Sequence, residues 1–179
     1  MRLEFYEGWL HPNGMRLGTI GLAPVQAVLS FLRQEGEAYG RVTRRAGEYA
    51  AEWTVASQWP AGRALIRAMP LWLRSRAVLR LARRTIRSTW QRSRTTLRLR
   101  RGHGRLDVLG SVFCAVREPS PERLCGFHEA VVLKLFELYD VPGVVRLDQC
   151  CAVGDPGCVI DVAVDRGQPR AAQGLASLE

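Results

Sequence analysis

Apolar residues recur every three or four positions through much of the first half of the chain, a pattern that predicts amphipathic helices. Four helices are expected, over residues 24–36, 37–53, 60–70 and 71–90. Pro24 suits the first turn of the first helix, and Gly36 suits its end. The second helix is expected to bury one face, which carries Tyr39, Val42, Ala46, Tyr49, Ala50 and Trp53.

Two later regions alternate apolar and polar residues, which predicts β-hairpins. In the first, a strand from Thr95 turns at Gly102-His103-Gly104 into a strand that starts near Leu106 and that Val112-Phe113-Cys114 would extend. The second hairpin joins residues 144–147 to residues 159–164. Between the hairpins, Ser120-Pro121 suits a helix start, and the expected buried stripe of that helix is Leu124, Phe127, Val131, Leu135 and Leu138.

The order of helices, hairpin, helix and hairpin predicts an α+β fold in which helices cover an antiparallel sheet of hairpins. With 179 residues and 47% hydrophobic content, the chain has enough apolar side chains for one core. Residues 24–165 are expected to form a single domain. Residues 1–23, interrupted by Pro and Gly, are expected to be irregular, and residues 166–179, which have few bulky side chains, are expected to be a flexible tail.

The chain is basic, with 26 Lys and Arg against 17 Asp and Glu and a net charge of +9. No acidic residue occurs from Trp53 to Leu106, where many arginines stand opposite the apolar stripe of the fourth helix. One interpretation is an ordinary solvated helix face. The other is a surface that docks on an acidic protein, a lipid membrane or a small anion. Nucleic acid is the least favoured partner, because the sequence shows no helix-turn-helix or other known reading motif.

No apolar run approaches the roughly 20 residues needed to cross a bilayer, and Met1 to Glu7 lack the order of a signal peptide. We therefore expect a cytoplasmic protein. In that compartment the 5 cysteines are expected to be reduced, so clustered thiols indicate metal ligands, core residues or redox-active groups rather than disulfides.

Two of these cysteines, Cys150 and Cys158, flank the turn residues Gly154 to Gly157 of the last hairpin. The turn brings the two thiols close enough to share a Zn²⁺ ion. Spacing alone favours buried structural thiols over a metal site, with redox or catalytic chemistry as a third alternative. Two ligands do not complete a zinc site. The candidates for the remaining positions are Cys125 and Asp148, with Cys151 or His128 as substitutes.

The motifs of nucleotide-binding loops, of serine hydrolases and of zinc proteases are absent from the sequence. Aromatic residues gather on the helical part, where they pack in the core or line an apolar cavity. The residues expected to line such a pocket are Tyr39, Tyr49, Trp53, Trp90 and Phe127.

The pattern C-x-x-x-G-D-x-x-C, formed here by Cys150, Gly154, Asp155 and Cys158, resembles the C-terminal signature of the 4-vinyl reductase domain family. That family includes a protein associated with bacteriochlorophyll synthesis, sensor segments of phenol- and xylene-responsive regulators, and hydrocarbon-binding proteins. The resemblance implies a fold similar to that of the TRAPP trafficking subunits, with an apolar cavity. It covers about the last third of the chain.

The resemblance also carries expectations about the site. In metal-binding relatives, a cysteine on the preceding helix and an acid shortly before the first hairpin cysteine complete a zinc site. Cys125 matches the former, but Leu147 stands where the acid is expected and Asp148 follows one position later.

The function that the resemblance implies is binding of an apolar small molecule: a hydrocarbon, an aromatic compound or a tetrapyrrole precursor. A homodimer is the expected assembly. The resemblance favours binding over catalysis. A vinyl reductase or its accessory subunit is the enzymatic alternative, for which the sequence supplies no flavin or nicotinamide motif. The competing class is an interaction protein whose arginine-rich helix docks on an acidic partner or a membrane surface.

Overall fold

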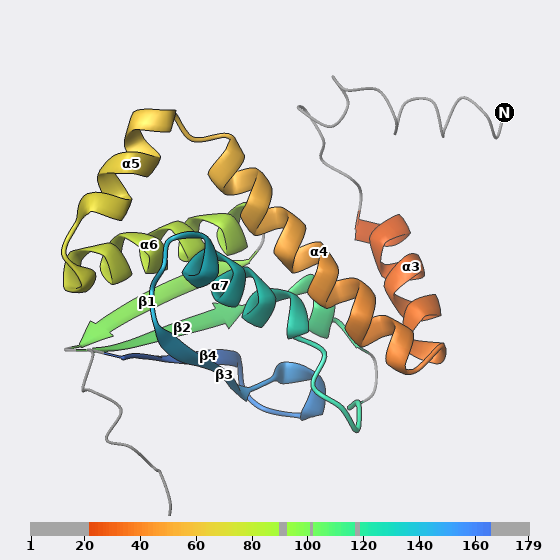
Figure 1. The fold of residues 1–179 in the computed structure, drawn as a ribbon. Helices are drawn as coiled ribbons and strands as arrows, with labels where there is room; N and C mark the ends of the chain where they lie inside the picture. The colour runs from red at the N-terminus through yellow and green to blue at the C-terminus, as the bar shows by residue number, and fades with distance from the viewer. Residues whose placement is uncertain (1–21, 90–92, 101, 117–118, 166–179) are drawn as a thin grey trace, which may run out of the picture.

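The computed structural model describes residues 22–89, 93–100, 102–116 and 119–165, and all structural statements below concern this part of the chain. It contains helices α3 (Leu22–Gln34), α4 (Glu37–Ala56), α5 (Pro60–Ala68), α6 (Leu71–Thr89) and α7 (Gly126–Leu138). The strands are β1 (Arg94–Arg100), β2 (His103–Leu109), β3 (Gly143–Gln149) and β4 (Cys158–Val164). The predicted α+β class is confirmed (Figure 1).

The two hairpins form one four-stranded antiparallel sheet in the order β1-β2-β4-β3. Their junction is the β2–β4 pair, in which Leu106 lies opposite Ile160 and Val108 opposite Cys158. These side chains are buried on the face that the helices cover. Helix α6 packs on β1, α7 packs on β3, and α4 crosses over α7 (Figure 1). The core therefore lies between the sheet and α6 and α7, with α4 as an outer layer.

The buried face of α4 differs from the predicted one. The structure buries a stripe of mostly small residues and exposes Val42, Tyr49 and Trp53; the buried residues are Tyr39, Thr43, Gly47, Ala51 and Val55. The reason is the close crossing with α7. A Cβ atom at Gly47 would lie 2.4 Å from the carbonyl oxygen of Phe127, so no side chain fits at the point where the two helices cross.

The segment before α7 also differs from the prediction. Residues 120–124 form bends and coil rather than a first helical turn, and α7 begins at Gly126 with Cys125 as its N-cap residue. Likewise, β2 ends at Leu109, and the buried residues Val112–Cys114 form a short 3-10 turn, η1, instead of continuing the strand. Both changes place cysteines in turns, where their side chains leave the regular pattern of helix or strand.

The other predicted boundaries fall largely outside the described residues. This applies to the irregular segment 1–23, of which only Leu22 and Ala23 are described, as the start of α3, and to the tail 166–179. In the described part of the chain, no helix combines the length and the apolar character needed to span a membrane.

Candidate metal centre

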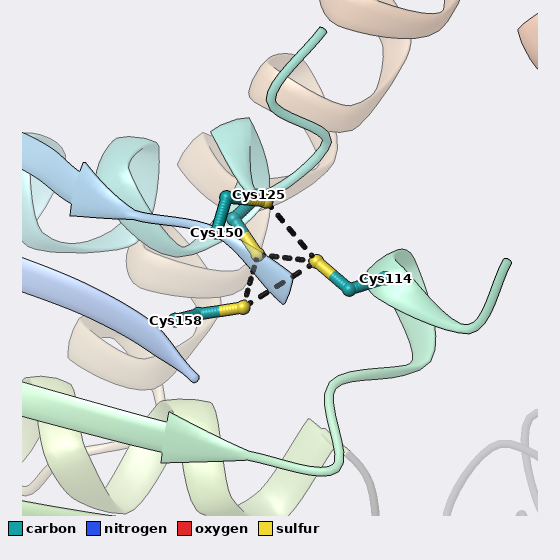
Figure 2. A group of neighbouring side chains, drawn as sticks. All are labelled: Cys114, Cys125, Cys150 and Cys158. Atoms are coloured by element: carbon teal, nitrogen blue, oxygen red, sulfur yellow. Dashed lines mark hydrogen bonds between the residues drawn. The ribbon is translucent and has the colours of Figure 1, made fainter. Parts of the chain in front are cut away.

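Four cysteines from four separate segments meet at one end of the sheet. Cys114 is the last residue of η1, Cys125 precedes α7, Cys150 follows β3, and Cys158 is the first residue of β4. All four side chains are buried. Figure 2 shows the four sulfur atoms directed toward a common centre.

The sulfur atoms are close enough to share one ion. The Sγ atom of Cys114 lies 2.8 Å from that of Cys125 and 3.4 Å from those of Cys150 and Cys158. All four lie within 4.8 Å of one another. Zinc bound tetrahedrally at about 2.3 Å would separate its sulfur ligands by roughly 3.8 Å, so a small adjustment accommodates the ion. Four buried sulfur donors select soft or borderline metals, chiefly zinc and iron.

The turn between β3 and β4 fixes the relative positions of Cys150 and Cys158. Its first part is the 3-10 turn η2 (Cys151–Val153), which ends at Gly154 with a φ of 100°, a left-handed conformation that glycine adopts without strain. The Oδ2 atom of Asp155 accepts a hydrogen bond of 2.8 Å from the backbone N–H of Cys150. The backbone N–H of Cys151 donates to the sulfur of Cys158 over 3.4 Å, a contact that favours a thiolate there.

The protonation of the thiols depends on their neighbours. Hydrogen bonding with Cys114 raises the pKa of the Cys125 thiol well above its usual range. Hydrogen bonding with Cys114 is also the main cause that raises the pKa of the Cys158 thiol. Hydrogen bonds from the surrounding thiols, Cys114 foremost, lower the pKa of Cys150 instead. The protein alone therefore favours the thiolate form at Cys150 and the thiol form at Cys125 and Cys158. A bound divalent cation would compensate the charge of further thiolates and release their protons.

Three of the predicted metal ligands, Cys125, Cys150 and Cys158, come together in this cluster, whereas Asp148 does not. Neighbouring residues on a strand point to opposite faces, and Leu147, opposite Ile160, faces the helices. Asp148 is exposed on β3. The fourth member of the cluster is Cys114, which sequence reasoning missed because it lay in an apolar run that suggested a strand.

Neither predicted substitute joins the cluster. Cys151 is half-buried, and burial raises the pKa of its thiol to about 11. The Nε2 atom of His128 lies 2.9 Å from the Oγ atom of Ser111, and burial lowers the histidine pKa to about 4, so the ring is neutral. His128 thus ties α7 to the segment that leads into Cys114.

Tyr39 and Phe127, two of the five predicted pocket residues, support the same region. The Tyr39 hydroxyl donates to the carbonyl oxygens of Phe113 and Leu124, the residues immediately before Cys114 and Cys125. The ring of Phe127 stacks on that of Phe113 with 4.6 Å between centroids. Both contacts hold the turn η1, which ends in Cys114, against the start of α7, which Cys125 precedes.

The other predicted pocket residues do not join them. Tyr49 and Trp53 are exposed on α4, at 50% and 66% of their surface, and Tyr49 lies against the Arg45 guanidinium. Trp90 lies outside the described residues.

A cavity of about 460 Å³ lies elsewhere, between the first half of α6 and the turn end of β1 and β2. Its apolar lining includes Leu71, Leu79, Leu99 and Val164, while Trp72, Ser75, Arg76, Arg100 and His103 supply aromatic and polar groups. The combination of apolar walls with a few polar groups is typical of small-molecule sites.

Cys114→Ser is expected to lower metal affinity by at least about 100-fold, because it removes one of four sulfur donors. Asp148→Asn, which alters an exposed carboxylate outside the cluster, is expected to leave the affinity unchanged. Competition with a chromogenic zinc chelator measures both. A loss of affinity in the Asp148 variant equal to that in the Cys114 variant would show that the fourth ligand is the carboxylate.

No protein-family model matches the sequence, and no curated protein matches it. Solved structures do resemble the fold. The phenol-responsive sensory domain of the transcription activator PoxR, crystallised with phenol, has a TM-score of 0.53 and 15% identity, covering 81% of this chain and 75% of that one. An H-NOX protein from S. oneidensis in the Fe(II)NO ligation state has a TM-score of 0.51 and 10% identity, covering 83% of this chain and 78% of its own. At such identities the likeness establishes a shared fold.

Proposed function

We propose that the protein is a small-molecule-binding domain, formed by residues 24–165, that takes an apolar ligand in the cavity between α6 and the β1–β2 hairpin. The observation that carries this proposal is the cavity itself, whose volume of about 460 Å³ lies within the range of ligand sites. The sensory domain of PoxR, which shares the fold, was crystallised with phenol. The resemblance of the last hairpin to the 4-vinyl reductase domain family supports the same class of ligand.

The lining favours a compact aromatic compound or a short hydrocarbon among the ligand classes expected from the family. Leu71, Leu79 and Leu99 offer apolar contact, and the Trp72 ring offers stacking. A tetrapyrrole precursor, which would imply a part in bacteriochlorophyll synthesis, would need to extend past the cavity rim. Ser75 and His103 belong to the same lining and supply its polar groups for a hydroxyl or carbonyl group of the ligand.

The role that we propose for the four cysteines is to hold a structural zinc ion. Sites that zinc uses for catalysis keep a coordination position open for water or substrate, whereas four cysteine ligands close the site. The four buried thiols also lack the access to solvent that a nucleophilic cysteine needs. The metal would thus support the fold at the end of the sheet opposite to the ligand site, because Cys158 begins β4 whereas the cavity lies against its last residue, Val164. Binding rather than a cysteine-dependent reaction is the function that the geometry favours.

Binding of 4-fluorophenol and 1-fluoronaphthalene, followed by ¹⁹F NMR, tests the cavity. Leu99→Trp, which places a large side chain in the lining, is expected to weaken binding at least about tenfold, because the ligand loses the volume that it would fill. Leu97→Trp is the matched control, since Leu97 lies on the same strand but outside the cavity lining. Equal affinity in the Leu99 variant and the wild type, or no binding by the wild type, would contradict the proposed site.

A further inference from the structure

Helix α5 is unusual among the described helices because none of its residues is buried. In Figure 1 it lies at the opposite side of the molecule from α3, and it packs mainly on α6. Yet the helix and its flanks are not polar. Trp59, which precedes the helix, is 77% exposed, Leu65 within it is 61% exposed, and Trp72 in the first turn of α6 is 60% exposed.

Arginines accompany these apolar side chains. Arg76 and Arg80 follow Trp72 on α6 at intervals of four residues, so the three lie along one side of the helix. The Arg76 guanidinium lies 5.6 Å from the centre of the Trp72 ring. In the described part of the chain, no arginine of α5 or α6 takes part in an ion pair. Since no acidic residue occurs between Glu52 and Asp107, α5 and α6 supply no carboxylate of their own to balance these arginines.

The exposed residues Trp59, Leu65, Trp72, Leu73, Arg76 and Arg80 are called the α5–α6 patch below. We propose that this patch docks on the surface of an anionic phospholipid bilayer. Tryptophan and leucine side chains gain free energy at the boundary between headgroups and acyl chains, while arginines are attracted to lipid phosphates. Helix α5 has only 9 residues, so it would lie on the bilayer rather than cross it.

The charge of the patch argues against the other occupants. A second copy docked through the same patch would bring like charges together without any acidic group to pair with them. Nucleic acid would compensate the arginines, but it would leave Leu65 and Leu73 without apolar contact. An anionic bilayer offers both kinds of contact at once.

Docking would also bring one rim of the cavity to the lipid surface, because Trp72 and Arg76 belong both to the patch and to the cavity lining. Trp59 and Leu65 do not line the cavity. Variants of these two residues therefore test docking without altering the proposed ligand site.

The experiment is cosedimentation of the full chain with phosphatidylcholine vesicles, either pure or with about one third phosphatidylglycerol. The wild type is expected to bind the anionic vesicles at least about tenfold more tightly than the neutral ones, and to lose that preference as NaCl rises from about 0.05 to about 0.5 M. Trp59→Ser combined with Leu65→Ser is expected to weaken binding about tenfold. Arg84 is exposed on α6 four residues after Arg80 and so extends the same side of the helix. Arg80→Gln combined with Arg84→Gln is expected to have a similar effect through charge alone.

Matched controls change similar residues elsewhere. Phe31→Ser removes an aromatic side chain that is 61% exposed on α3, and Arg44→Gln with Arg94→Gln removes two exposed positive charges outside α5 and α6. Both controls are expected to bind within about twofold of the wild type. Equal binding to neutral and anionic vesicles, or equal losses in test and control variants, would overturn the proposal.

Two further measurements separate the other occupants. The first measurement is binding to poly-uridylate RNA. If the double variant Trp59→Ser with Leu65→Ser binds both this RNA and the vesicles as tightly as the wild type, the proposal is overturned in favour of a polyanion. A dimer in sedimentation velocity that the same double variant dissociates would overturn it in favour of a second copy. If the double variant weakens vesicle binding and changes neither RNA binding nor the oligomeric state, the result supports docking on the bilayer.

Discussion

Replacing Cys158 with serine is expected to abolish metal binding and to lower the free energy of unfolding by at least about 3 kcal/mol, since metal binding is coupled to folding in closed cysteine sites. For a chain of this length, that loss corresponds to a fall of about 6–12 °C in melting temperature. Cys158 is fully buried and begins the strand β4 at the centre of the sheet. Its loss therefore disturbs the metal cluster and the core together.

The matched control is Cys151→Ser. Cys151 lies in the same turn, is half-buried and stands outside the group of four cysteines. It is expected to retain about one zinc per chain and the wild-type melting temperature. Elemental analysis of the purified proteins and thermal unfolding by circular dichroism measure both properties. A wild-type protein without metal, or a Cys158 variant as stable as the control, would contradict the structural metal site.

Gly47→Ala is expected to destabilise the fold by about 3 kcal/mol, at the upper end of what overpacking of a core costs. A Cβ atom at this position would meet the Phe127 carbonyl oxygen at 2.4 Å and the Ala130 Cβ atom at 2.9 Å. The carbonyl belongs to the backbone of α7, so relief of the clash requires movement of the whole helix rather than of one side chain. Chemical denaturation provides the measurement.

Gly40→Ala is the control on the same helix. A Cβ atom at Gly40 would have no neighbour within 4 Å, and the position is exposed. Alanine favours a helix over glycine by about 0.8 kcal/mol, so this variant is expected to be slightly more stable than the wild type. The two substitutions thus change stability in opposite directions. Similar effects from both would contradict the close crossing of α4 and α7.

The sequence predicted the parts of the site that depend on neighbouring residues. Cys150 and Cys158 flank a turn whose Gly and Pro residues are recognisable, so their proximity could be inferred locally. Cys114 could not be placed in this way. It joins the cluster because β2 pairs with β4, with Val108 opposite Cys158, and because the chain leaves β2 toward the same end of the sheet. That pairing joins segments far apart in the sequence.

Helix α4 shows a second limit of sequence reasoning. The spacing of its apolar residues predicts a helix that buries the bulky residues Val42, Tyr49 and Trp53, whereas the structure buries Gly47 and Ala51 among other residues. The usual association of large apolar residues with the core fails where two helix backbones approach closely. Only the position of α7 reveals that small residues are required there, and this position depends on the tertiary fold.

The order of the cysteines along the chain divides the cluster into two local pairs. Cys114 and Cys125 are close in sequence, as are Cys150 and Cys158, while α7 and β3 lie between the pairs. Closing each short loop costs little conformational entropy, so either pair is able to capture an ion weakly in a partly folded chain. Tight binding of the metal requires α7 to pack on the sheet, because this packing brings the two cysteine pairs together. The rate at which metal leaves the native protein would then report how often α7 lifts from the sheet.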